Sequence, residues 1–345
     1  MQSVIIEKNQ AGQRLDKFLH KYLPLAGTGF LHKMLRKKNI TLNGKKAEGH
    51  EILALDDRVC MFFSEETFAK FSGTSATTAD GQAPKTSLAL EGMAACSCLR
   101  GITVLYEDED FLILDKPAGI LTQKAEAGDS SLNEWLIGYL LSANAISEEE
   151  LCTFHPSVCN RLDRNTSGIV LCGKSLPGLQ YLSKCIKDRS VRKFYHTICV
   201  GALRGPAKIE GYLVKDTAKN RVTVSQSSPL CHAEEKASPV CTIYSPLLTT
   251  EKYTLLEVEL ITGKTHQIRA HLASIGHPLI GDFKYGQESI NGVLKKSCGL
   301  RHQLLHACRV EFPTADSGAG MSLSGKTICA PYPDFFKKIQ RELLE

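Results

Sequence analysis

The stretch Asn160–Gly168, NRLDRNTSG, places one carboxylate, Asp163, between Arg161 and Arg164 and just before an apolar run, Ile169–Leu171. Because a neighbouring cation stabilises the ionised form of a carboxylic acid, we expect Asp163 to be charged and available as a nucleophile or base. The β-branched residues that follow predict a buried strand, with the carboxylate at its beginning. A salt bridge within an ordinary polar turn explains the same residues, and the local sequence leaves both interpretations open.

The basic residues are concentrated near the beginning of the chain. Lys and Arg total 42 against 37 Asp and Glu, a formal charge of +5, yet nine Lys or Arg and a single acid, Asp16, lie between Gln13 and Lys46. Apolar residues recur there twice at helical spacing, which predicts two short amphipathic helices, and Asn43–Gly44 then predicts a hairpin. Such a unit suits contact with nucleic-acid phosphates, although a solvated charged face explains the same pattern.

The composition changes between Ser72 and Cys98, where Ser, Thr, Ala and Gly dominate and aromatic side chains are missing. Such a segment buries little apolar area, so we expect a flexible linker. A chain of 345 residues suffices for two domains. We therefore predict a basic module at 1–63, a linker at 64–100 and the main domain at 101–345.

The thirteen cysteines are odd in number and lack the spacing of a zinc site, so we expect them to be reduced. The first residues show no signal-peptide pattern, and no apolar run approaches the roughly 18 residues that a membrane span requires. These features predict a cytoplasmic protein without a membrane segment.

Strand patterns outnumber helical ones between Ile102 and Phe312, and several neighbouring strands are joined by connections too short for parallel crossovers. We therefore predict an α+β fold built on a mainly antiparallel mixed sheet. A second junction of interest follows the strand Tyr253–Ile261, where Arg269 is placed close to the start of a predicted helix. The spacing of three histidines, His266, His271 and His277, does not put three ligands on one helix face, so no metal site is predicted.

The residues around Asp163 resemble the Arg-Leu-Asp-x-x-Thr-Ser-Gly motif of the RluA-type pseudouridine synthases, which isomerise uridine in structured RNA. Lys116–Gly119 and Thr262–Arg269, TGKTHQIR, resemble further motifs of that family in the same order. The resemblance implies that Asp163 is the catalytic aspartate, that Arg269 pairs with it, and that Tyr195 stacks on the target uracil and assists proton transfer. Periodicity alone makes Tyr195 an ordinary aromatic residue of a sheet.

The same resemblance implies a mechanism without a cofactor. The target uridine must leave its helix to expose the reacting carbons, at a cost of a few kcal/mol, and Arg161 is placed to fill the gap. Many relatives have His at the position of Asn160, so the role of that side chain stays open. Whether Asp163 attacks the sugar or the base also stays open.

The basic module resembles the S4-type RNA-binding domain that many of these enzymes carry. We expect RNA as the partner, with 23S-type ribosomal RNA as the substrate, and a monomeric enzyme. The side chains expected to contact RNA in this module are Arg14, Lys17, Lys33, Arg36, Lys37 and Lys45.

Two other classes remain open. A retaining glycosidase also uses an aspartate nucleophile, but it needs a second carboxylate about 5 Å away, and the motifs supply Arg and Tyr instead. A ribosome-assembly factor that binds RNA without catalysis fits the basic module equally well.

Overall fold

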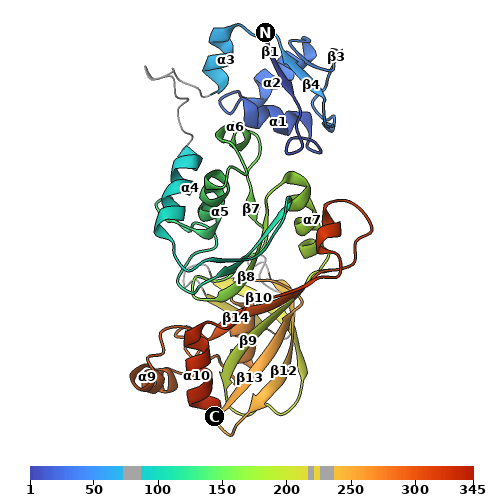
Figure 1. Cartoon of the computed structure of the whole chain (residues 1–345). Coiled ribbons are helices and arrows are strands. Elements are labelled where there is room, and N and C mark those ends of the chain that lie inside the picture. The colour runs from blue at the N-terminus through green and yellow to red at the C-terminus, as the bar shows by residue number, and fades with distance from the viewer. Residues whose placement is uncertain (73–86, 217–220, 226–236) are drawn as a thin grey trace.

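The computed structural model describes residues 1–72, 87–216, 221–225 and 237–345. A small N-terminal module lies at one end of an elongated molecule, and a larger domain makes up the rest (Figure 1). No helix in these ranges is long and apolar enough to cross a membrane.

The N-terminal module contains a four-stranded antiparallel sheet in the order β1-β4-β2-β3. Its elements are β1 Gln2–Ile5, α1 Leu15–Tyr22, α2 Thr28–Arg36, β2 Ile40–Leu42, β3 Lys45–Lys46, β4 Arg58–Met61 and α3 Glu65–Ser72. The two predicted helices and the hairpin are confirmed. Asn43 and Gly44 form the turn with positive φ angles of 51° and 72°, a conformation that these two residue types tolerate. Phe18 and its buried apolar neighbours form a separate core for this module.

The prediction of a flexible linker over 64–100 is wrong for the described part of that segment. Helix α3 packs Phe68 and Phe71 against the core of the N-terminal module, so this module extends to residue 72. Helix α4, Ser87–Cys98, packs on α5, Leu132–Ser142, and a Cβ at Gly138 would lie 2.1 Å from the carbonyl oxygen of Gly92. Small residues let the two helix backbones approach closely, and this close packing stabilises the helix pair without large side chains. The linker prediction depended on the absence of such large side chains. Residues 73–86 lie outside the described ranges.

The larger domain is built on a mixed sheet in the order β11-β10-β12-β13-β9-β14-β8-β6-β5, with β15 paired to β14 and β7 paired to β8. The pair β14–β8 is parallel and the other pairs are antiparallel. The predicted α+β class with a mainly antiparallel sheet is therefore confirmed. The strands are β5 Thr103–Glu107, β6 Phe111–Lys116, β7 Ser157–Val158, β8 Ser167–Gly173, β9 Arg192–Val200, β10 Ala207–Asp216, β11 Arg221–Ser225, β12 Ser238–Thr249, β13 Tyr253–Leu260, β14 Leu305–Glu311 and β15 Thr327–Cys329.

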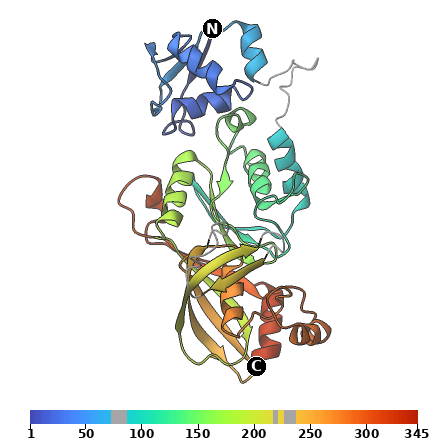
Figure 2. The ribbon, with the colours of Figure 1, turned by 180° about the vertical axis from the view of Figure 1, so that it is seen from behind.

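Helices cover the sheet in two groups, which Figure 2 shows from behind. The remaining helices are α6 Glu148–Leu151, α7 Leu176–Lys187, α8 Gln267–Ser274, α9 Glu288–Ser297, the 3-10 helix Ala319–Leu323 and α10 Asp334–Leu344. Side chains of α4, α5, α7 and α8 join the main core. Helices α9 and α10 cover a second cluster that includes Ile198 of β9 and Leu255 of β13.

The beginning of strand β8 is held in place by its contact with the neighbouring strand β14. Gly168 has a φ of 108°, and a Cβ there would lie 2.2 Å from the carbonyl oxygen of Ala307 on β14. Only glycine fits this close parallel approach of two backbones. The loop that carries Asp163 ends directly before this contact, so the sheet holds one end of the loop in place.

The N-terminal module contacts the larger domain through polar side chains. Lys8 Nζ lies 2.7 Å from Glu109 Oε1 and 3.4 Å from Asp110 Oδ1. Gln10 donates a hydrogen bond of 3.1 Å to the hydroxyl of Thr153. The module is therefore attached by hydrogen bonds and ion pairs as well as by the chain.

Candidate active site

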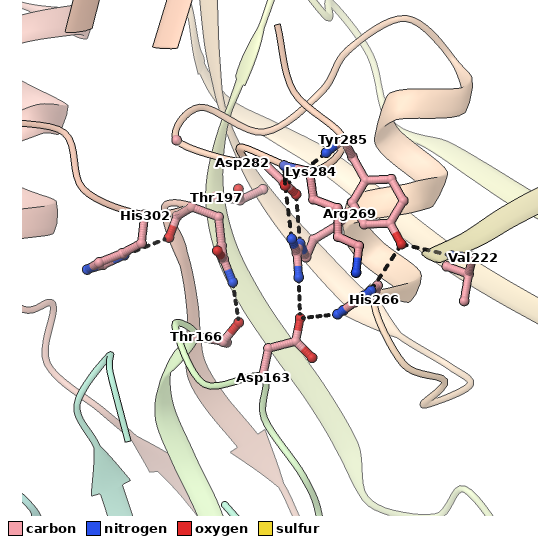
Figure 3. Close-up of polar contacts among 12 residues, drawn as sticks. Asp163, Thr166, Thr197, Val222, His266, Arg269, Asp282, Lys284, Tyr285 and His302 are labelled. Carbon is pink, nitrogen blue, oxygen red and sulfur yellow. Dashed lines mark hydrogen bonds and ion pairs between the residues drawn. The ribbon is translucent and has the colours of Figure 1, made fainter. Parts of the chain in front are cut away.

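Asp163 and Arg269 meet at the centre of the sheet, although 106 positions separate them in the chain. Arg269 lies in the first turn of α8, and its Nη1 donates to Asp163 Oδ2 at 2.8 Å (Figure 3). The arginine side chain is 8% exposed and that of Asp163 is 24% exposed. A charge-assisted hydrogen bond in such a site orients the carboxylate.

A buried lysine holds the loop that carries Asp163. Lys116 ends strand β6 and is fully buried, and its Nζ donates to the carbonyl oxygens of Pro117, Ile120 and Arg164 at 2.9, 2.9 and 3.1 Å. Burial lowers the pKa of Lys116 to about 7, while the charge of Asp163 acts in the opposite direction. Three carbonyl acceptors match the three donors of an ammonium group, so Lys116 ties two loops together beneath the site.

A second carboxylate, Asp282, fixes Arg269 from the other side. Asp282 Oδ2 accepts from Nε at 2.7 Å and Oδ1 accepts from Nη2 at 2.9 Å, in a side chain that is fully buried. Burial raises the pKa of Asp282, but the hydrogen bonds and the charge of Arg269 outweigh burial and lower it below its ordinary value. The bidentate contact fixes the guanidinium plane, so the remaining Nη1 points at Asp163.

Tyr195 on β9 lies in the same pocket as Asp163 and Arg269, together with apolar side chains such as Leu260 and Leu305. It is 5% exposed, and burial followed by the negative charge of Asp163 raises the pKa of its hydroxyl. The pocket opens into a cleft of about 720 Å³, which Arg161 also lines. The structure thus brings together all three residues predicted as catalytic and places Arg161 beside them.

Asn160 has a structural contact and does not reach Asp163. Its Nδ2 donates to the carbonyl oxygen of Ile169 at 3.2 Å, and its Oδ1 accepts from the amide of Leu171 at 2.7 Å. The side chain therefore pairs with the edge of β8 and supports the loop.

The predicted RNA-binding residues of the N-terminal module lie far from this pocket (Figure 1). All six predicted basic residues of the module are exposed, namely Arg14, Lys17, Lys33, Arg36, Lys37 and Lys45. Arg14 differs, because its guanidinium donates to Asp16 at 3.1 and 2.7 Å, which compensates its charge. The contact of Arg14 with RNA stays a prediction. In the described ranges, no cluster of three metal-ligating side chains occurs.

Sequence reasoning missed three residues around Arg269, namely Asp282, Tyr285 and His266. Asp282 and Tyr285 stand in the segment GDFKYG, whose two glycines and aspartate after the buried Ile280 mark a tight turn. That turn signal was present, but nothing in it shows that the aspartate points inward. The spacing of His266 from the other histidines bears only on metal binding and does not predict its contact with Tyr285.

The chain is similar to several known proteins. Residues 110–274 match the family model described as RNA pseudouridylate synthase. The chain is 28% identical over 329 residues to the ribosomal large subunit pseudouridine synthase C of Vibrio parahaemolyticus, covering 94% of this chain and 92% of that protein. It is 31% identical over 218 residues to the ribosomal large subunit pseudouridine synthase D of Borreliella burgdorferi, covering 61% and 64%. The solved structure of human RNA pseudouridylate synthase domain containing 4 covers 74% of this chain and 97% of its own, with a TM-score of 0.55 and 22% identity, a likeness of fold.

The fold, the pocket and these matches point to one class of protein. The family match and the relatives support an RNA pseudouridine synthase, an isomerase that converts uridine to pseudouridine in RNA. The relatives named pseudouridine synthase C and D support an enzyme of the RluA type, similar to that branch.

Proposed function

We propose that Asp163 is the catalytic aspartate, that Arg269 orients it, and that Tyr195 contacts the target uracil. The observation that carries this proposal is the hydrogen bond of 2.8 Å between Arg269 and Asp163, in a pocket that Tyr195 also lines. An ionised carboxylate can act on the nucleotide while the C1′–N1 bond breaks, and the uracil then turns so that C5 joins C1′. The proton that leaves C5 provides the assay.

We propose that the cleft takes a nucleotide flipped out of a paired strand. Its volume of about 720 Å³ exceeds that of a single base, and its lining includes the basic residues Arg161, Arg164, Arg189, Lys193 and Lys264. Positive charge of this kind attracts the phosphates on either side of the flipped residue. Arg161, exposed at the rim, is suited to occupy the space that the base leaves in the helix.

Acid–base catalysis of the glycosidase kind fits this cleft poorly. Asp163 is the only acidic residue among the described residues that line it, whereas a retaining glycosidase needs a second carboxylate within about 5 Å. Asp282 cannot serve, because it is fully buried and both of its oxygens are bound to Arg269.

We further propose that the substrate is large-subunit ribosomal RNA, the RNA that the names of the relatives point to. The test is to incubate the purified protein with 23S-type ribosomal RNA or with transfer RNA, each carrying 5-tritiated uridine. We expect tritium release and mapped pseudouridines in ribosomal RNA. Tritium release from transfer RNA but not from ribosomal RNA would mean that transfer RNA is the substrate. We also propose that the enzyme acts in the cytoplasm as a monomer, since one chain supplies the complete cleft.

The N-terminal module is proposed to bind RNA as an S4-type domain. A groove of about 440 Å³ between α2 and the segment after β3 is lined by Lys33, Arg36 and Lys46, with Glu48 as its one acidic residue among those described. All three cations are exposed. Such a groove neutralises phosphates without reading bases, so it would hold the RNA while the distant cleft selects the uridine.

Replacing Lys33, Arg36 and Lys46 together with glutamine should weaken RNA binding and make it less dependent on salt. If each side chain neutralises one phosphate, the slope of log affinity against log salt becomes shallower by about two to three units. Fluorescence anisotropy of a labelled ribosomal RNA fragment between low and moderate salt measures the slope. Turnover of a short substrate that reaches only the cleft should change little, because these contacts position the RNA and do not stabilise the transition state.

The matched control replaces Lys295, Lys296 and Lys337 with glutamine. These lysines are exposed on α9 and α10, at the other end of the molecule (Figure 1). The net charge of the protein changes equally in both variants. The slope of log affinity against log salt should therefore differ between them only if RNA binds specifically in the groove. Equal slopes in the two variants would show that the groove is a solvated charged face.

A further inference from the structure

The hydroxyl of Tyr285 links two partners next to the active site. Its oxygen lies 2.9 Å from the backbone nitrogen of Val222 and 3.0 Å from Nδ1 of His266 (Figure 3). A backbone N–H can only donate, so the tyrosine oxygen accepts from Val222 and its own proton is available for Nδ1. In a neutral imidazole ring that accepts at Nδ1, the proton is on Nε2.

The protonated face of His266 is turned toward Asp163. Nε2 lies 3.8 Å from Asp163 Oδ2, the same oxygen that accepts from Arg269. Burial, the largest influence, lowers the pKa of His266; Asp163 opposes this shift, and Arg269 and Lys284 add to it. Burial therefore favours the neutral form of the ring. Among the described residues, no donor contacts the other carboxylate oxygen, Oδ1.

The backbone supports a functional role for this histidine. His266 has a φ of 55° directly before helix α8, in the left-handed region that few residues other than glycine occupy, although histidine, asparagine and aspartate do so more often than the others. Its neighbour Tyr285 is fixed by the guanidinium groups of Arg221 and Arg269, each 5.2 Å from the ring centre. Local strain held by rigid surroundings is often found at functional sites.

We infer that Tyr285 sets the tautomer of His266, and that the Nε2–H of this ring is a second donor that positions Oδ2 of Asp163 and leaves Oδ1 to meet the nucleotide. The inference rests on the proposed role of Asp163. A separation of 3.8 Å is longer than a hydrogen bond, and a shift of about 1 Å on RNA binding closes it, as is common for catalytic groups of free enzymes. His266 is thus a positioning residue.

Two substitutions at the same position separate this role from a role in packing. Glutamine in His266→Gln can place an amide N–H where Nε2 lies, whereas asparagine in His266→Asn is too short to reach Asp163. Asparagine, however, tolerates the left-handed backbone better than glutamine does. We therefore expect the two variants to rank differently in stability and in rate. His266→Asn should be at least as resistant to thermal unfolding as His266→Gln, but it should release tritium about tenfold more slowly in a single turnover at saturating enzyme. Affinity for the RNA should be equal in both.

Tyr285→Phe tests the tautomer. It should slow the wild-type enzyme about three- to tenfold, but slow His266→Gln no further, because glutamine has no ring tautomer to set. The loss of the acceptor for Val222 occurs in both backgrounds and cancels in the comparison. Equal rates for His266→Gln and His266→Asn, or the same loss from Tyr285→Phe in both backgrounds, would overturn the inference. Asp163→Asn, measured in parallel, separates a failure of this inference from a failure of the proposed function. If Asp163→Asn is inactive while the His266 variants do not differ, only the tautomer inference fails. If Asp163→Asn is active, the proposed function fails.

Discussion

Replacing Asp163 with asparagine abolishes tritium release from RNA that contains 5-tritiated uridine, with a rate at least about a thousandfold below that of the wild type. The expected cause is chemical, because an amide cannot supply the ionised oxygen that acts on the nucleotide. The substitution is almost isosteric, and the amide oxygen can still accept from Arg269 at the present distance of 2.8 Å. Fold and RNA affinity should therefore remain close to those of the wild type.

A matched control is Asp129→Asn. Asp129 also lies beside an arginine of the motif loop, with its Oδ1 4.0 Å from Arg164, but the cleft lining does not include it. The control should release tritium at the rate of the wild type. Turnover by Asp163→Asn at a comparable rate would show that the carboxylate is not required, and the reaction would need another group in the cleft.

The sequence predicted the sheet and the reactive loop because these depend on local patterns. Alternation of apolar residues identifies strands such as β9, and polar turn residues before β8 identify the loop of Asp163. The contact between Arg269 and Asp163 was predicted only from the family resemblance, because no local sequence pattern connects residues so far apart in the chain.

Two features escaped prediction for physical reasons. The role of Asp282 cannot be predicted from the sequence because it depends on burial of the side chain. A carboxylate in a polar turn is exposed far more often than buried. Helix α4 escaped because it packs by the approach of small residues, with Gly92 against Gly138. Composition measures the apolar area of side chains, and it does not report how closely two backbones can approach.

Asp282→Asn is expected to give the largest loss of stability among the changes considered. Both oxygens of Asp282 are bound to Arg269, and Oδ1 also accepts from the backbone amides of Lys284 and Tyr285 at 2.9 and 3.0 Å. Asparagine keeps one acceptor but turns an NH₂ group toward an N–H of Arg269. Disrupting a buried ion pair at one partner costs about 3–5 kcal/mol of the free energy of unfolding. Catalysis should also slow, because Arg269 loses the contact that directs Nη1 to Asp163.

Trp135, the single tryptophan of the chain, lies buried in α5, so its fluorescence during urea unfolding reports on the larger domain. The control Asp334→Asn removes an exposed carboxylate that lies 3.6 Å from Lys337, and surface pairs of this kind contribute little. We expect the control to unfold like the wild type and Asp282→Asn to unfold at clearly lower urea.

The dependence on pH provides an independent check of the same pair. The pKa of Asp282 is lowered in the folded protein, so the unfolded chain binds a proton at this carboxyl before the folded protein does. The ion pair therefore stabilises the fold above the ordinary carboxyl pKa of about 4, and this contribution is lost as the pH falls through the lower pKa of the folded state. Asp282→Asn has no such group, so the difference in unfolding free energy between wild type and variant should narrow below about pH 4. A difference that stays constant from pH 7 to pH 3 would mean that the lost stability comes from packing and not from the charge of Asp282.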